Sequence, residues 1–211
     1  MTFEHDLSLY LFDKGIIQFG EFTLASGKTS PYYVDVRKIL GHPEEHSRVI
    51  RALATAIRTT SGWQAPAGLV GVPTGGLAIA AALAYATRMP LAYVRKEAKS
   101  YGTGKRVEGM EFVEGSTRVL LIEDVVTTGG SVADAIAPLR AAGAQVTDAF
   151  TVIDRMGGGT ERLAAEGVTL HSLLTIADIV DCLHEEGMIS AETVSAVLAT
   201  TTTAAPEPAP G

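Results

Sequence analysis

The feature of this sequence that most restricts its fold is a repeated order of apolar run, glycine-rich turn and helical stretch. Four largely apolar runs predict β-strands, at residues 68–72, 91–94, 118–124 and 146–154. The first and third lead through glycine-rich turns into helical stretches at residues 77–87 and 132–142. Runs of this kind are typical of buried parallel strands, and strands that alternate with helices form a doubly wound α/β sheet. Ligands of such sheets usually bind beyond the carboxyl ends of the strands.

The residues before the first of these strands predict a different arrangement. Apolar residues recur at helical spacing ahead of Gly15, so we expect an opening amphipathic helix that ends near this glycine. Two short extended pieces are expected at residues 22–24 and 32–36. A longer helix, which begins with a proline, is expected over residues 43–59.

Length and composition suit one compact domain. The chain has 211 residues, of which 46% are hydrophobic, and we expect the domain to span residues 1–199. The proline-rich residues 200–211 show no periodicity and are expected to be disordered. No apolar run approaches the roughly 20 residues of a membrane span, and Cys182 is the only cysteine, so no intramolecular disulfide can form. We therefore expect a cytoplasmic protein with no membrane partner.

The charge distribution indicates a small anionic ligand. The net charge of −7 argues against broad binding to nucleic acid, which requires a basic face. Residues 95–106 (RKEAKSYGTGKR) nevertheless hold five basic residues and one acidic residue. A solvated charge run is the ordinary interpretation of such a segment. We favour a glycine-containing, mobile connection that reaches a polyanion, because its cations cluster beside the two predicted anion sites given below, in an otherwise acidic chain.

The strongest signal for chemistry is residues 119–132, VLLIEDVVTTGGSV, where a buried strand leads into a Thr-Thr-Gly-Gly-Ser turn and a helix. Glycines let successive backbone N–H groups surround an anion, and the positive end of the following helix dipole favours phosphate. Glu123 and Asp124 precede this turn and can accept hydrogen bonds from sugar hydroxyls. An ordinary turn with solvated acids is the alternative, but buried carboxylates need partners. The combination therefore predicts a ribose phosphate site.

A second turn, residues 71–76 (GVPTGG), also follows a strand and precedes a helix. It can offer N–H groups to another phosphate, and on sequence grounds a plain strand-to-helix connection is about as good an interpretation. These two turns and the basic segment would lie at one edge of a parallel sheet.

Residues 119–132 resemble the phosphoribosyl pyrophosphate (PRPP) motif of type I phosphoribosyltransferases. Residues 19–37 (FGEFTLASGKTSPYYVDVR) and 95–109 (RKEAKSYGTGKRVEG) together resemble the orotate enzymes of that family, and so does the IDR sequence at 153–155. The resemblance extends from the first predicted helix to about Gly187. It implies the type I phosphoribosyltransferase fold, a mostly parallel sheet flanked by helices with a small hood from the N-terminal segment.

The implied activity is Mg²⁺-dependent transfer of the phosphoribosyl group from PRPP to orotate, which gives orotidine monophosphate and pyrophosphate in de novo pyrimidine (UMP) biosynthesis. Mg²⁺ would be held mainly by the ligand and by water, with no direct protein ligand. The resemblance also implies a homodimer with shared active sites and a cis peptide bond between Pro73 and Thr74. A purine phosphoribosyltransferase and a non-catalytic PRPP-sensing regulator are the alternatives. Arg155 opposes the first, and the lack of an added DNA-binding module opposes the second.

Site residues follow from matching positions. The predicted catalytic residues are Lys99, Asp124 and Glu123. The PRPP-binding positions are Thr74, Gly75, Arg95, Lys96, Lys99, Tyr101, Glu123, Asp124, Val125, Val126, Thr127, Thr128, Gly129, Gly130 and Ser131. The orotate-binding positions are Lys28, Tyr33, Val34, Thr127 and Arg155. The chain departs from many bacterial members at Ala25 and Gly75, where they carry lysine, and at Tyr101, where they carry histidine.

Overall fold

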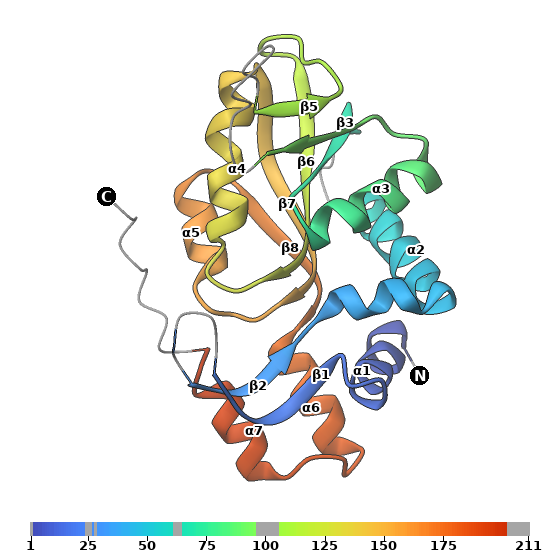
Figure 1. The fold of residues 1–211 in the computed structure, drawn as a ribbon, viewed down its shortest axis with the longest axis vertical. Coiled ribbons are helices and arrows are strands. Elements are labelled where there is room, and N and C mark those ends of the chain that lie inside the picture. The colour runs from blue at the N-terminus through green and yellow to red at the C-terminus, as the bar shows by residue number, and fades with distance from the viewer. Residues whose placement is uncertain (1, 24–26, 28, 61–64, 96–105, 202–211) are drawn as a thin grey trace.

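The fold is described from a computed structural model, over residues 2–23, 27, 29–60, 65–95 and 106–201. Its main feature is a six-stranded sheet with the strand order β5-β4-β3-β6-β7-β8 (Figure 1). The strands are β3 (Gly68–Gly71), β4 (Leu91–Val94), β5 (Val107–Gly109), β6 (Thr117–Val126), β7 (Ala144–Asp154) and β8 (Thr169–Thr175). All neighbours pair in parallel except β4 and β5, which are antiparallel. The predicted doubly wound, mostly parallel sheet is confirmed.

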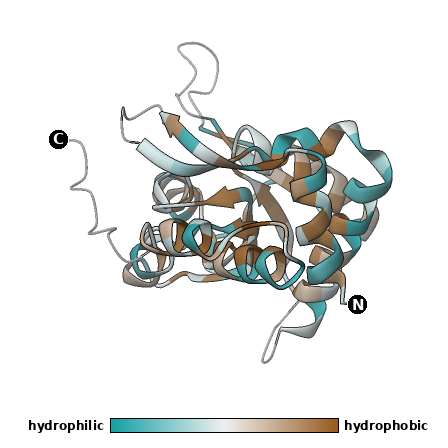
Figure 2. Ribbon diagram, turned by 90° about the horizontal axis from the view of Figure 1, so that it is seen from below, coloured by the Kyte–Doolittle hydropathy of each residue, from teal (hydrophilic) through white to brown (hydrophobic). Residues whose placement is uncertain are grey.

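Two layers of helices cover the sheet. Helices α2 (Pro43–Thr59) and α3 (Gly75–Thr87) lie on one side, and α4 (Gly130–Ala141) and α5 (Gly159–Ala165) lie on the other (Figure 1). Successive side chains of a strand point to opposite faces. Along β6, Leu120 and Ile122 accordingly join the apolar cluster that contains α2 and α3, whereas Val119 and Leu121 join the cluster that contains α4. In Figure 2 the strands are mostly apolar, while hydrophilic and apolar residues alternate along the helices.

A hood stands beside the carboxyl edge of the sheet. It contains α1 (Phe3–Asp13), the antiparallel pair β1 (Ile17–Thr23) and β2 (Thr29–Val34), and the 3-10 helix η1 (Val36–Gly41). The hood was predicted from the N-terminal segment alone, but α6 (Ile176–Glu185) and α7 (Ala191–Leu198) also pack into it (Figure 1). Apolar side chains of α1 and α6 lie in one continuous cluster with those of the sheet.

The structure differs from the sequence prediction in several boundaries. The strand expected to end at Asp124 continues to Val126, because residues 125 and 126 still pair with β7. The piece expected to be extended through Val36 ends at Val34, where η1 follows after Asp35. The sequence prediction also missed β5, α5, β8, α6 and α7. The first two are too short to show periodicity, but α6 begins with a Thr175 and Asp178 capping box that the sequence displays.

No helix in the described ranges is long and apolar enough to cross a membrane.

An ion-pair network closes the amino edge of the sheet, opposite the edge at which the turns of interest lie. The carboxylate of Asp148, on β7, accepts hydrogen bonds from Arg118 of β6 at 2.8 Å and from Thr147 at 2.7 Å, and contacts His171 of β8 at 2.9 Å. Burial raises the pKa of Asp148, but the hydrogen bonds from these three residues outweigh it and hold the pKa below its usual range. The network therefore joins three strands through one buried carboxylate.

We predict that this network stabilises the fold only above acidic pH. Because the pKa of Asp148 is lower in the folded chain, its contribution is present above the unfolded value of about 3.9 and is lost as the pH falls through the folded value. Asp148→Asn should lower the thermal midpoint at pH 7, and the gap to wild type should shrink as the pH falls below about 4. Melting curves between pH 7 and pH 3 measure this. The exposed change Asp181→Asn is the control, and an Asp148→Asn gap that stays constant with pH contradicts the prediction.

Candidate active site

Three turns meet at the carboxyl edge of the sheet, because β3, β6 and β7 are parallel neighbours. The turn after β3 leads into α3, the turn after β6 leads into α4, and the turn after β7 leads into α5 (Figure 1). We call them the 73–76 turn, the 127–131 turn and the 155–159 turn. The first two coincide with the glycine-rich turns singled out in the sequence, and Arg155 lies in the third.

The acid pair lies on the last residues of β6. Glu123 is only 6% exposed, and its Oε1 accepts the backbone N–H of Asp124 at 3.0 Å. Burial, followed by the hydrogen bond and the charge of neighbouring Asp124, raises the pKa of Glu123 to about 9. Asp124 is more accessible. At neutral pH the free chain therefore holds Glu123 as a neutral carboxyl that can donate a hydrogen bond, beside an acid that can accept one.

The 73–76 turn lies directly against this acid pair. The predicted cis peptide bond between Pro73 and Thr74 is confirmed. A Cβ atom at Gly76 would lie 2.5 Å from the carbonyl oxygen of Ile122 and 2.6 Å from Glu123 Oε1. A Cβ atom at Gly75 would overlap the carboxylate of Asp124. The atom nearest to a Cβ at Gly76 belongs to the backbone of β6, whereas a Cβ at Gly75 would meet only the end of the Asp124 side chain, which can move. The close approach of the turn to the acids therefore depends on glycine at position 76.

The 127–131 turn lines a cavity at the amino end of α4. Gly129 has a φ of 72°, a left-handed conformation that glycine adopts at no steric cost, and it caps the 12-residue helix α4. Residues Glu123 and Val125 to Val132 line a cavity of about 270 Å³. The cavity opens at the amino end of α4, where the helix dipole and free N–H groups favour a phosphate. Arg162 of α5, which the sequence prediction missed, has its Nη1 only 3.4 Å from the Cβ position of Gly130.

The 155–159 turn packs against the 127–131 turn through glycines. A Cβ atom at Gly157 would lie 2.8 Å from Thr127 Cγ2, and one at Gly159 would lie 3.2 Å from the backbone nitrogen of Gly129. Asp154 shapes the turn by accepting hydrogen bonds from the Met156 backbone at 2.8 Å and from the Thr160 hydroxyl at 3.2 Å. The three consecutive glycines at 157–159, which follow Met156, are visible in the sequence and are a signal for this turn that was missed.

Arg155 projects from this turn and contacts the hood. Its backbone N–H donates to the carbonyl of Val126 at 2.8 Å, and its side-chain Nε donates to the hydroxyl of Tyr32 at 3.0 Å. The predicted base-binding residue Tyr33 follows Tyr32 on β2, and its ring packs against Phe22 with centroids 5.8 Å apart. The structure thus brings Tyr32, which was not among the predicted site residues, to Arg155.

Of the site residues predicted in the basic segment, residues 95–106, the structure describes only Arg95. Arg95 lines a cavity of about 400 Å³ together with Pro73 and Ser131, and its buried Nε has no hydrogen-bond partner within the described ranges. Its backbone N–H donates to the carbonyl of Arg106 at 2.8 Å, so the two ends of the segment are joined beside the 73–76 turn. The predicted residues Lys28, Lys96, Lys99 and Tyr101 lie outside the described residues.

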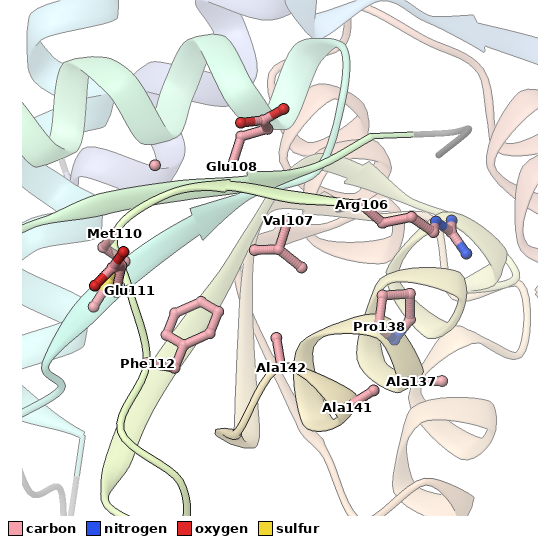
Figure 3. Close-up of a pocket in the computed structure, with 11 residues that line it drawn as sticks. Arg106, Val107, Glu108, Met110, Glu111, Phe112, Ala137, Pro138, Ala141 and Ala142 are labelled. Atoms are coloured by element: carbon pink, nitrogen blue, oxygen red, sulfur yellow. The ribbon is translucent and has the colours of Figure 1, made fainter. Parts of the chain in front are cut away.

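A larger cavity, of about 1090 Å³, lies between β5, the segment that follows it and the C-terminal half of α4. Figure 3 shows Phe112 and Val107 on one side, and Ala142 and Pro138 on the other. It contains none of the predicted site residues. In the described part of the chain no group of three or more histidine, cysteine, aspartate or glutamate side chains is arranged to hold a metal ion.

We predict that Glu123 makes the free protein less stable as the pH rises. Its folded pKa of about 9 exceeds the ordinary value of 4.5, so between these values the folded state keeps a proton that the unfolded state has released. Stability must then fall with rising pH across this window. Glu123→Gln cannot titrate, so its thermal midpoint should gain on wild type as the pH rises from 5 to 9. The exposed change Glu185→Gln is the control. Parallel pH curves for wild type and Glu123→Gln contradict the assignment.

The chain is similar in sequence and in fold to known phosphoribosyltransferases. Residues 35–198 match the phosphoribosyl transferase domain family. The chain is 44% identical over 197 residues to the orotate phosphoribosyltransferase of Cenarchaeum symbiosum (strain A), which covers 93% of this chain and 98% of the relative. The crystal structure of orotate phosphoribosyltransferase from Aeropyrum pernix matches with a TM-score of 0.67 and 34% identity, over 86% of this chain and 99% of that one. Leishmania donovani UMP synthase matches with a TM-score of 0.81 and 30% identity, over 95% of this chain and 42% of that one. The chain therefore belongs to the orotate phosphoribosyltransferases, within the type I phosphoribosyltransferase family.

Proposed function

We propose that this chain transfers the phosphoribosyl group of PRPP to orotate, producing orotidine monophosphate and pyrophosphate for UMP biosynthesis. One observation carries the proposal: Arg155 lies on a turn that packs against the 127–131 turn, beside an acid pair suited to a sugar diol. A planar guanidinium pairs with a planar carboxylate through two parallel hydrogen bonds. Orotate carries such a carboxylate, whereas uracil and hypoxanthine do not.

The 127–131 turn binds the 5′-phosphate of PRPP in this proposal, through its backbone N–H groups and the threonine and serine hydroxyls. Glu123 and Asp124 bind the ribose hydroxyls, one as a donor and one as an acceptor. The cavity of about 270 Å³ supports this assignment, since it lies at the amino end of α4, where backbone N–H groups can donate to a phosphate. Thr74, Gly75 and Arg95 bind the pyrophosphate group. The buried, unpartnered Nε of Arg95 supports its part in this.

The site also fits a Mg²⁺ ion that keeps most of its ligands as water and phosphate oxygen, because Asp124 is a hard oxygen donor and Glu123 beside it is held neutral by burial. When bound, the ion would neutralise charge on the departing pyrophosphate. Glu123 and Asp124 are the residues that would lie nearest to it, and the ligand's own oxygens would hold it.

In the reaction, the bond from ribose C1 to the pyrophosphate oxygen breaks and its electron pair leaves with pyrophosphate. A ring nitrogen of orotate then forms the new bond to C1 from the opposite face, and its N–H proton passes to water or to the departing pyrophosphate. The sugar is cationic in between, and the negative charge of Asp124 stabilises it. Tyr33, Val34, Thr127 and Arg155 hold the base, with Lys28 as a further candidate. No covalent protein nucleophile is needed.

We further propose that the protein works in the cytoplasm as a homodimer, with residues 1–199 as one domain and residues 200–211 as a tail. In this arrangement Lys96, Lys99 and Tyr101 belong to a loop that completes the site of the neighbouring subunit. The joined ends of the basic segment, beside the 73–76 turn, support a function for this segment at the pyrophosphate. Lys99 adds positive charge to the leaving group.

An activity assay with three different bases tests the proposed function. With PRPP and Mg²⁺, the protein should convert orotate, and should leave uracil and hypoxanthine almost unchanged. Asp124→Asn should fold normally but lower turnover by about two to three orders of magnitude, because an amide cannot supply charge near the sugar cation. Asp181→Asn, on the outer side of α6, should keep full activity. Preference for hypoxanthine would indicate a purine enzyme. Binding of PRPP without turnover of any base would indicate a regulator.

Mixing of two inactive variants tests the shared site. A Lys99→Ala subunit keeps a sound ribose phosphate pocket, and an Asp124→Asn subunit keeps a sound loop, so a mixed dimer holds one site with both defects and one with neither. Equal amounts make about half of the dimers mixed, so activity should rise from nearly none to about a quarter of wild type. If verified subunit exchange restores no activity, Lys99 serves its own subunit.

A further inference from the structure

Arg155 is held by one hydrogen bond at its backbone and by another at its side chain. Its backbone N–H is bonded to Val126 of β6, which fixes where the side chain begins. Its guanidinium lies over the ring of Tyr32, with Cζ 4.5 Å from the ring centroid, and its Nε donates to the hydroxyl of the same ring at 3.0 Å. One tyrosine therefore supplies a cation–π contact and a hydrogen bond to one guanidinium.

Tyr32 is itself held rigidly. It is 1% exposed and lies on β2, where it pairs with Phe19 of β1. The hydroxyl of Ser30 donates to the backbone carbonyl of Tyr32 at 2.7 Å. A buried ring on a hydrogen-bonded strand has one orientation available, so its hydroxyl is a fixed acceptor for Arg155.

The hydrogen bond to Tyr32 leaves the two terminal nitrogens of the Arg155 guanidinium available to a ligand. Because Nε is used by Tyr32, both Nη nitrogens remain for a planar anion. No carboxylate forms an ion pair with Arg155 within the portion of the chain that the structure describes. Freezing a long, flexible side chain in advance lowers the entropy that binding must otherwise remove.

We propose that Tyr32 is a positioning residue that orients Arg155 toward the carboxylate of the base. Through Tyr32, a strand of the hood would then determine which base is bound. This rests on the proposed function, since the carboxylate is that of orotate. Tyr32 does not touch the base in this proposal. Its effect should be confined to carboxylate-bearing substrates and should depend on the presence of Arg155.

Tyr32→Phe is the first test, because phenylalanine keeps the ring and its packing and removes only the hydroxyl. The KM for orotate should rise about tenfold, as expected for loss of a hydrogen bond to a charged group, while the KM for PRPP stays unchanged. The low residual kcat/KM for uracil, which lacks the carboxylate, should also stay unchanged when it is measured at high enzyme concentration. Tyr10→Phe is a matched control. Tyr10 also lies near a cation, with Lys14 Nζ 5.9 Å from its ring centroid, but it is on α1.

A double-mutant cycle is the second test. In an Arg155→Gln background, Tyr32→Phe should no longer change the KM for orotate, because the residue that it positions is absent. Equal losses for orotate and uracil, an equal rise in the KM for PRPP, or additive effects in the cycle would each overturn the proposal and leave Tyr32 as a packing residue. If wild type itself shows no activity with orotate, the proposed function fails and this inference is overturned with it, whereas additive effects in an active enzyme overturn the inference alone.

Discussion

The parallel pairing of β6 with β3 on one side and β7 on the other is the constraint on which the site depends. Gly71 of β3 lies beside Ile122, and Asp154 of β7 lies beside Val126. Parallel neighbours run about 4.8 Å apart and end at the same edge, so the turns that follow them must be in contact. Three segments separated by tens of residues in the sequence thus form one surface.

This close approach explains both the glycines and the unusual acid. Gly75, Gly76, Gly157 and Gly159 lie where any Cβ atom would overlap a neighbouring turn or strand. At Gly76 the absence of a side chain lets the backbone lie against Glu123, and burial of this acid is the largest cause of its raised pKa. The packing of the 73–76 turn and the protonation of Glu123 therefore depend on the same contact.

Much of this site was readable from the sequence. The four predicted strands, the helices that follow them and the acid pair all occur as expected, since alternating burial and glycine-rich turns are local patterns. Resemblance to orotate phosphoribosyltransferases predicted the cis bond between Pro73 and Thr74, and it singled out Arg155 as a base-binding residue. What was missed has little local signal: the three-residue β5, the seven-residue α5, and the packing of α6 and α7 into the hood.

By itself the sequence determined the alternation of the four central strands with helices, the glycine-rich turns at the strand ends and the residue types in those turns, because periodicity, glycine and charge act over a few neighbouring residues. Only the tertiary structure decided the condition of those residues. The proton on Glu123 depends on burial, and the choice of Tyr32 rather than Tyr33 as the partner of Arg155 depends on which face of β2 meets β7. Desolvation and contacts between residues 123 positions apart arise from packing, and no local pattern encodes them.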